Sequence, residues 1–218
     1  MTPRPLDRLR GVYVLADDDP RWRHGVRAQL EGALAGGATA VQLRLKHTAD
    51  GEALELARWA AARARAAGAL LFVNDRFDLA LLAGADGVHL GQDDLAPERL
   101  PADARARLIV GLSTHTLEQV DASGARPVDC VAFGPVFATA SKQSEYAPRG
   151  LDALRAAAAR AHCPLVAIGG ITAETLAAVR GAGACAAAVI SAVADAADPA
   201  RATRYLQARF AAPPPRSD

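Results

Sequence analysis

Apolar runs that end in a small cluster of polar or glycine residues recur along this chain at roughly regular intervals. Typical examples are VQLRLK at 41–46, LLFVND at 70–75 and GVHLGQDD at 87–94. Several of these runs are apolar on both faces, as expected for parallel strands that are covered by helices. In parallel α/β barrels, binding and catalysis take place at the carboxyl ends of the strands. The pattern therefore predicts a fold and also the end of that fold at which a site should lie.

Strand-like and helix-like segments alternate, which predicts a repeating βα unit. The expected strands are residues 11–16, 39–45, 70–74, 87–90, 108–112, 128–134, 165–169 and 186–191. Alanine- and leucine-rich stretches with helical spacing lie between them, at 22–35, 52–67, 117–123, 151–161, 172–180 and 199–210. Residues 76–83 are short for a helix, and residues 95–106 are ambiguous. Glycines precede several strands, where a left-handed residue can end the preceding helix.

Eight such strands predict an α/β fold, a single (β/α)8 TIM barrel over residues 11–210. Residues 1–10 would form an N-terminal extension and residues 211–218 a disordered tail. The 218 residues fit one barrel domain, which takes roughly 200–250 residues. An open, doubly wound sheet is the alternative, but no GxGxxG motif follows the first strand.

The charge balance excludes broad classes of partner. Lys and Arg total 25 and Asp and Glu total 24, so the net charge of +1 does not indicate a nucleic-acid or anionic-membrane surface. No apolar run approaches the ~18 residues of a transmembrane helix, and no signal-peptide core follows the N-terminus. The three cysteines lack CxxC spacing, which fits reduced thiols in a cytoplasmic protein. We therefore expect small-molecule partners, no nucleic acid and no membrane, and the sequence leaves a homo-oligomer open.

Acidic residues follow two neighbouring expected strands. Asn74 and Asp75 end the third strand, and Asp93 and Asp94 follow the fourth. Adjacent strands lie about 4.8 Å apart, so these carboxylates can converge. Two carboxylates, together with substrate phosphate oxygens, are a usual way to hold Mg²⁺. The alternative is that Asp75 caps the next helix and that Asp93 or Asp94 sits in a turn.

Basic residues point to an anion at the same end of the barrel. Arg44 and Lys46 alternate with leucines at the end of the second strand, so both lie on one face. At the barrel mouth, arginine would give an anion a forked contact and lysine a point charge. Lys142 lies in the long irregular stretch 134–150, which is typical of a loop that covers an active site. The alternatives are a solvated basic face and a plain surface loop.

The last two expected strands end in AIGGIT (167–172) and AAVIS (187–191). Backbone amides at glycines and at helix starts bind phosphate well. This corner of a TIM barrel frequently holds a phosphate group, so we expect one here.

Motifs for several other kinds of chemistry do not occur in the sequence. None of the five histidines has HxxxH or HExxH spacing, so zinc is not expected. His89 fits a packing or hydrogen-bonding residue at a strand end, whereas His115 lies near the expected mouth and is a candidate for ligand contact. There is no GxSxG elbow and no P-loop.

Taken together, these segments resemble the thiamine phosphate synthase family. The matching pieces are VQLRLK, FVNDRFDLAL, GADGVHLGQDDL, GLSTHTLEQ, FGPVFATASK, APRGL, AIGGIT and AAVISAV, in family order across about residues 11–195. FVNDR followed by ADGVHLGQDD is the specific part. The resemblance implies a TIM-barrel transferase of thiamine biosynthesis. Such an enzyme condenses 4-amino-2-methyl-5-(diphosphooxymethyl)pyrimidine with a (carboxy)thiazole phosphate, giving thiamine phosphate and pyrophosphate, with loss of CO₂ from the carboxylated form.

The resemblance also implies a role for each matching residue. The catalytic residues would be Arg44, Lys46, Ser113 and Lys142, and the cofactor Mg²⁺ would be held by Asp75 and Asp94. The substrate-binding residues would be Gln42, Leu43, Arg44, Leu45, Lys46, Asn74, Ser113, Thr139, Ala140, Ser141, Lys142, Gly170, Ile190 and Ser191. The family often has glutamate where Leu45 stands and threonine where Ser141 stands. Alternation turns Leu45 away from the ligand face, and serine keeps the hydroxyl.

The implied reaction is a Mg²⁺-assisted dissociative substitution, which needs no protein nucleophile. The aminopyrimidine would stabilise the cation left when pyrophosphate departs, and the thiazole nitrogen would then attack it. Three alternatives are a thiazole tautomerase of the sister family, a sugar-phosphate isomerase or epimerase, and a non-catalytic thiamine-precursor binding protein. The paired aspartates argue against the tautomerase, and the basic pair on the second strand argues against the isomerase.

Overall fold

The computed structural model describes residues 6–141 and 146–213, in which eight parallel strands close into a barrel. Each strand pairs with the next in chain order, and β1 also pairs with β8. The strands are β1 (Gly11–Asp17), β2 (Ala40–Arg44), β3 (Leu70–Asn74), β4 (Gly87–Leu90), β5 (Ile109–Thr114), β6 (Cys130–Phe133), β7 (Leu165–Ile168) and β8 (Ala186–Val189). The predicted (β/α)8 TIM barrel is confirmed.

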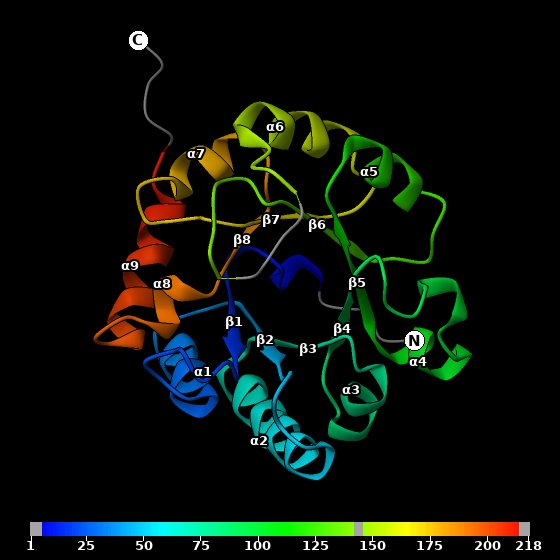
Figure 1. Ribbon diagram of the computed structural model, residues 1–218, viewed down its shortest axis with the longest axis vertical. Helices are drawn as coiled ribbons and strands as arrows, with labels where there is room; N and C mark the ends of the chain where they lie inside the picture. Colours follow the sequence, from blue (N-terminus) through cyan, green and yellow to red (C-terminus); the bar gives the residue numbers. More distant parts are fainter. Residues whose placement is uncertain (1–5, 142–145, 214–218) are drawn as a thin grey trace.

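Helices form an outer ring around the strands (Figure 1). The α-helices are α1 (Val26–Ala35), α2 (Asp50–Ala67), α3 (Phe77–Ala83), α4 (Ala102–Arg107), α5 (Leu117–Ser123), α6 (Gly150–Arg160), α7 (Leu176–Gly181), α8 (Ser191–Ala194) and α9 (Pro199–Ala211). Two 3-10 helices, η1 (Leu6–Arg8) and η2 (Pro97–Arg99), complete the described elements. Within residues 6–141 and 146–213, no helix has the length and apolar character needed to cross a membrane.

Side chains that alternate along the strands form two separate apolar clusters. Val12, Val14 and Val41 belong to the outer cluster, between the strands and the helices. Tyr13 and Phe72 belong to the inner cluster, which fills the barrel interior. Because both faces of the strands are buried, the sequence reads as continuous apolar runs instead of alternating ones.

The barrel interior becomes polar toward the carboxyl ends of the strands. On β3, Leu70 and Phe72 lie in the apolar interior, whereas Asn74 lines the cavity beyond it. Glycine makes room for larger inward side chains, because a Cβ at Gly111 would lie 2.5 Å from His89 Nδ1. The polar groups of this chain are therefore gathered at one end of an otherwise apolar barrel.

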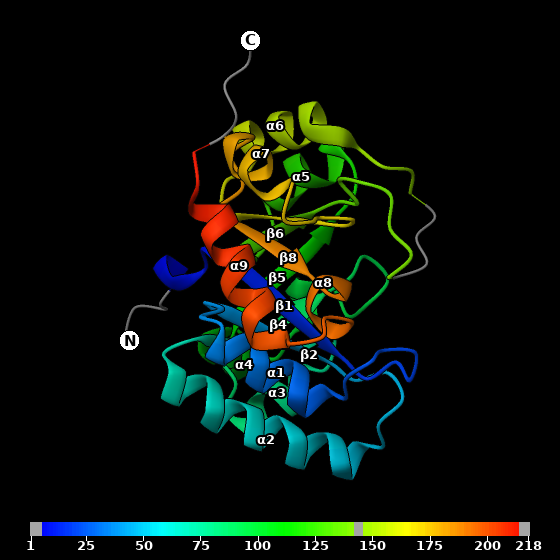
Figure 2. The same ribbon diagram turned by 90° about the vertical axis from the view of Figure 1, so that its left-hand side faces the viewer.

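The two ends of the barrel differ in what covers them (Figure 2). The loops after β1, β2 and β6 extend from one end, and η1 lies at the other. Leu9, which follows η1, is buried in the inner cluster. The described part of the expected N-terminal extension therefore packs onto the barrel.

Some helix bounds differ from the expected ones. α1 begins at Val26 and not at residue 22, because Gly25 is still extended, with φ −65° and ψ 161°. α7 begins at Leu176, because residues 172–175 form a turn in which the Thr175 hydroxyl accepts from the Thr172 amide. The ambiguous stretch 95–106 contains η2 and most of α4, and α9 continues to Ala211.

Candidate active site

A cavity of about 990 Å³ opens at the carboxyl ends of the strands. The predicted site residues that line it are Gln42, Arg44, Lys46, Asn74, Asp75, Asp94, Ser113, Thr139, Ala140, Ser141, Gly170, Ile190 and Ser191. They come from separate βα units, so the fold gathers residues that are far apart in the sequence. Lys142 lies outside the described residues.

Two predicted substrate-binding residues lie elsewhere. Leu43 is fully buried in the outer apolar cluster, and Leu45 packs against that cluster. Alternation along β2 turns these side chains outward while Gln42 and Arg44 face the cavity. The structure therefore gives the side chains of Leu43 and Leu45 no contact with the cavity.

The carboxyl groups of Asp75 and Asp94 meet at the cavity wall. The pKa of Asp94 is raised, first by partial desolvation and then by a hydrogen bond with Asp75. Lys46 Nζ lies 2.5 Å from Asp75 Oδ2, so positive charge already sits beside the pair. Asp94 Oδ2 also accepts from the Gly91 amide at 2.6 Å. The convergence expected from neighbouring strand ends is thus present.

The backbone around Asp75 is held in an uncommon conformation. Asp75 has a φ of 61°, the one positive φ of a non-glycine residue in the described ranges. Its amide donates to the His89 carbonyl at 2.8 Å, which extends the β3–β4 ladder by one residue. The N-cap of α3 is Arg76, without a side-chain cap, so Asp75 does not cap that helix. A strained, non-capping residue at a strand end is typical of a functional site.

A buried carboxylate, that of Asp17, holds the Arg44 guanidinium in place. Arg44 Nη1 lies 2.6 Å from Asp17 Oδ2, and Asp17 is only 1% exposed. Trp22 Nε1 donates to the other oxygen, Asp17 Oδ1, at 3.1 Å. A buried charge with both oxygens bonded holds Arg44 in one orientation toward the cavity.

The loop after β2 is fixed by Asp18. Its carboxylate accepts hydrogen bonds from the backbone amides of Lys46, His47 and Thr48 and from the Thr48 hydroxyl, all at 2.8 Å. Partial burial raises the pKa of Asp18, but these hydrogen bonds outweigh it, so the pKa is lowered overall. Asp18 thereby sets the backbone from which Lys46 reaches Asp75.

The floor of the cavity holds further hydrogen-bonding groups. Gln42 Nε2 donates to the Tyr13 hydroxyl at 2.8 Å, and both residues are buried. Burial raises the pKa of Tyr13 well above its usual value, so the hydroxyl stays protonated. His89 Nε2 lies 3.0 Å from Ser113 Oγ. These groups can orient a flat polar molecule by hydrogen bonding.

A second polar corner lies where the loop after β6 meets the end of β8. Ser141 Oγ lies 3.2 Å from Ser191 Oγ, and the Ser141 amide donates to Thr139 Oγ1 at 3.2 Å. Gly170 approaches this loop so closely that a Cβ would lie 2.3 Å from the Ala138 carbonyl oxygen. Hydroxyls beside the start of α8 are uncharged hydrogen-bond donors of the kind that can bind a phosphate.

The rim near the loop after β6 contains stacked side chains. The His115 and Tyr146 rings are parallel, with centroids 4.2 Å apart, and His115 Nδ1 lies 2.6 Å from the Gly134 carbonyl oxygen. Arg149 lies on the Tyr146 ring, 5.3 Å from its centroid. The predicted proximity of His115 to the mouth is correct, since it lines the cavity.

Sequence reasoning missed several residues of the cavity. Tyr13, Trp22, Gln92 and Tyr146 line it, and Asp17 supports it from below. Tyr13 and Asp17 could have been found, because they share a face of the first strand with period two. Trp22 and Tyr146 lie in irregular loops, where spacing carries no such signal.

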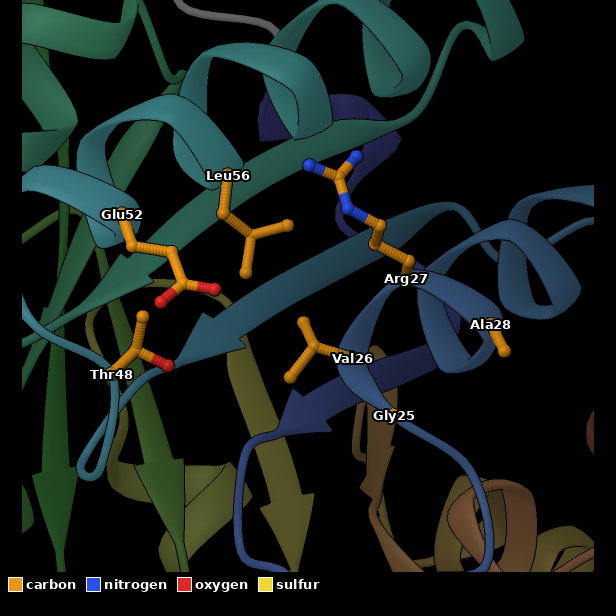
Figure 3. Close-up of a pocket in the computed structure, with 7 residues that line it drawn as sticks. All are labelled: Gly25, Val26, Arg27, Ala28, Thr48, Glu52 and Leu56. Atoms are coloured by element: carbon orange, nitrogen blue, oxygen red, sulfur yellow. The ribbon is translucent and has the colours of Figure 1, made fainter.

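A smaller pocket of about 410 Å³ lies outside the barrel, between α1 and α2 (Figure 3). Figure 3 shows Val26 and Arg27 of α1 facing Glu52 and Leu56 of α2 across it. The Arg27 guanidinium is 4.5 Å from the Trp59 ring centroid, so it is already engaged. We therefore assign the candidate active site to the larger cavity.

A closed parallel barrel with acidic, basic and hydroxyl groups gathered at the carboxyl ends of its strands defines a TIM-barrel enzyme. The family model described as thiamine monophosphate synthase matches residues 12–193. The chain belongs to this family.

Individual relatives agree with the family match. The chain is 48% identical over 206 residues to the thiamine-phosphate synthase of Anaeromyxobacter dehalogenans, covering 94% of this chain and 90% of the relative. It is 42% identical to that of Chloroflexus aurantiacus over 90% of this chain and 91% of the relative. Among solved structures, thiamine phosphate pyrophosphorylase from Pyrococcus furiosus superposes with a TM-score of 0.82 and 35% identity, covering 93% and 96% of the two chains.

Proposed function

We propose that this chain condenses 4-amino-2-methyl-5-(diphosphooxymethyl)pyrimidine with a (carboxy)thiazole phosphate to give thiamine phosphate and pyrophosphate, with loss of CO₂ when the thiazole is carboxylated. The observation that carries the proposal is the presence of two different polar clusters in one cavity. A charged site combines Arg44 and Lys46 with the two carboxylates, and a neutral site combines hydroxyls at Ser141 and Ser191. The first suits a diphosphate with its metal, and the second suits a monophosphate.

The donor set fits Mg²⁺. The carboxyl groups of Asp75 and Asp94 lie close together, and the Lys46 ammonium already lies against Asp75. In the described part of the chain, no group of three or more acidic, histidine or cysteine side chains has metal-binding geometry. Two carboxylates suffice for Mg²⁺, which keeps several waters and takes substrate phosphate oxygens. When bound, Mg²⁺ would offset the charge that develops on the departing pyrophosphate.

The chain's own residues would do the rest by position and charge. Arg44, fixed by Asp17, and Lys46 would hold the diphosphate, so that its bond to the pyrimidine methylene carbon can break. Gln42 and Ser113, on the cavity floor, would keep the ring in place while the thiazole nitrogen attacks that carbon. The sequence adds Lys142 to this set, and a covering loop would keep water from the cation.

One assay tests the proposal directly. Both phosphorylated precursors are mixed with enzyme and Mg²⁺, and thiamine phosphate and pyrophosphate are measured together. We expect equimolar products, no turnover with EDTA and no thiamine phosphate when either precursor is omitted. Isomerised thiazole phosphate in the absence of the pyrimidine would instead indicate a tautomerase, and failure to form thiamine phosphate would refute the proposal.

A further inference from the structure

Arg21, in the loop after β1, reaches across the cavity mouth to the loop after β6. Its Nη1 donates to the Ala140 carbonyl at 3.1 Å, and its Nη2 donates to the Ser141 carbonyl. These residues are 119 and 120 positions away in the sequence. A forked contact to two successive carbonyls fixes the path of that backbone, which a single point charge cannot do.

The guanidinium is itself held on its remaining sides. Arg21 Nε lies 3.3 Å from Asp19 Oδ2, and the group stacks on the Trp22 ring at 4.4 Å from the centroid. Trp22 in turn donates to Asp17, the carboxylate that anchors Arg44. Arg21 and Arg44 are therefore both linked to Asp17, Arg21 through Trp22 and Arg44 directly, although the Arg21 side chain is half-exposed.

The backbone that Arg21 holds carries the hydroxyls of the neutral site. The Ser141 hydroxyl forms a hydrogen bond with Ser191 Oγ. The Ser141 amide donates a hydrogen bond to Thr139 Oγ1. Arg21 contacts the backbone carbonyls of this segment. The hydroxyls of Thr139 and Ser141, two residues that line the cavity, therefore remain available to a ligand. A shift of the segment would move Ser141 away from Ser191 without touching the carboxylate pair.

We propose that Arg21 is a positioning residue that sets the affinity of the neutral site for the monophosphate substrate. The proposal rests on the function proposed above. It assigns Arg21 no contact with the reacting atoms. Its effect should therefore fall on the thiazole phosphate and leave the pyrimidine diphosphate largely unaffected.

The test compares Arg21→Ala and Arg21→Lys with Arg23→Ala. Arg23 is an exposed arginine two residues along the same loop that does not line the cavity, so its variant controls for loss of charge. Steady-state kinetics are measured with each substrate varied in turn, and thiazole phosphate binding is measured calorimetrically without the second substrate. Thermal denaturation monitors folding.

Arg21→Ala should raise the KM and the Kd for thiazole phosphate about tenfold or more, since small misplacements of binding groups are costly. The KM for the pyrimidine diphosphate should change by less than about twofold. Arg21→Lys should recover only part of the loss, because lysine lacks the fork. Added guanidinium ion should partly rescue Arg21→Ala, and Arg23→Ala should match the wild type.

Three other outcomes of this experiment would contradict the positioning role or the proposed function. An equal rise in both KM values with a lower Tm would mean that Arg21 is only a structural contact. An unchanged KM for thiazole phosphate in an active enzyme would remove the positioning role alone. A wild-type enzyme that forms no thiamine phosphate would remove the proposed function and this proposal together.

Discussion

The carboxyl groups of Asp75 and Asp94 lie close together, although the two residues follow different strands of the barrel. Two carboxylates this close repel each other when both are ionised, which raises the pKa of Asp94 beyond what its partial desolvation does. The Lys46 ammonium at Asp75 offsets part of this repulsion. Such an arrangement costs folding free energy, so it indicates a site selected for binding positive charge.

Replacing Asp94 should separate activity from stability. Asp94→Asn should lower kcat by about a hundredfold or more, because the variant loses an electrostatic contribution to charge stabilisation in the transition state. The free energy of unfolding should stay the same or rise, since the like-charge contact is removed. Thiamine phosphate formation at saturating Mg²⁺ and urea denaturation provide the two measurements.

Asp93→Asn is the matched control for that variant. Asp93 lines the same cavity and changes charge identically, but it is not part of the Asp75–Asp94 pair of carboxyl groups. A much smaller effect than that of Asp94→Asn is expected. Near-normal turnover of Asp94→Asn at saturating Mg²⁺ would show that Asp94 does not serve the metal.

Gly170, which lies against the loop after β6, should be replaceable only at high cost. Gly170 and Gly68 both have positive φ, at 62° and 71°, so alanine strains either backbone by about 1–2 kcal/mol. Only at Gly170 would the new Cβ also collide, at 2.3 Å from the Ala138 oxygen, whereas nothing lies within 4 Å at Gly68. Gly170→Ala should therefore lose clearly more stability in urea denaturation than Gly68→Ala. It should also raise the KM for thiazole phosphate, and equal losses in the two variants would contradict the assigned backbone approach.

The Asp18 carboxylate should make a pH-dependent contribution to stability. Its folded-state pKa is lowered, so the contribution is present above its ordinary value of 3.8 and is lost as pH falls through the folded value. Asp18→Asn should cost about 1–2 kcal/mol near neutral pH, since the charged acceptor for the Lys46–Thr48 segment is weakened. The difference in unfolding free energy between Asp18→Asn and the wild type should shrink when denaturation is measured at pH values below the lowered folded-state pKa. Asp152→Asn, at a side chain that is 99% exposed, should show no such trend.

The barrel and most of the cavity lining followed from the sequence for a physical reason. Strands buried on both faces leave continuous apolar runs, and polar residues are tolerated in them only where the strand reaches the open end. Asp75 and Asp94 could therefore be paired before any coordinates were known. The family resemblance, and not periodicity, supplied Thr139 and Ser141.

Several of the residues that escaped prediction act across loops. Arg21 and Ser141 meet only because two irregular segments cross the same mouth, and neither segment has a repeat that fixes its path. Helix starts were also missed where glycine or a turn delayed them, as at Gly25. Loop conformation depends on such distant contacts, which a one-dimensional pattern does not contain.

Tyr13 and Gln42 should be energetically coupled in the cavity floor. The Gln42 amide donates to the Tyr13 hydroxyl at 2.8 Å, and the two side chains are 3% and 2% exposed. Tyr13→Phe leaves a buried donor without this acceptor, which should cost about 1–3 kcal/mol. Gln42→Leu alone should also destabilise, because it removes the partner of a hydroxyl that burial keeps protonated. The double variant should lose less than the sum, by about 0.5–3 kcal/mol, which a urea double-mutant cycle would measure. Strict additivity would mean that each group bonds elsewhere, and Tyr13 would then not support the role proposed for Gln42 in holding the pyrimidine ring.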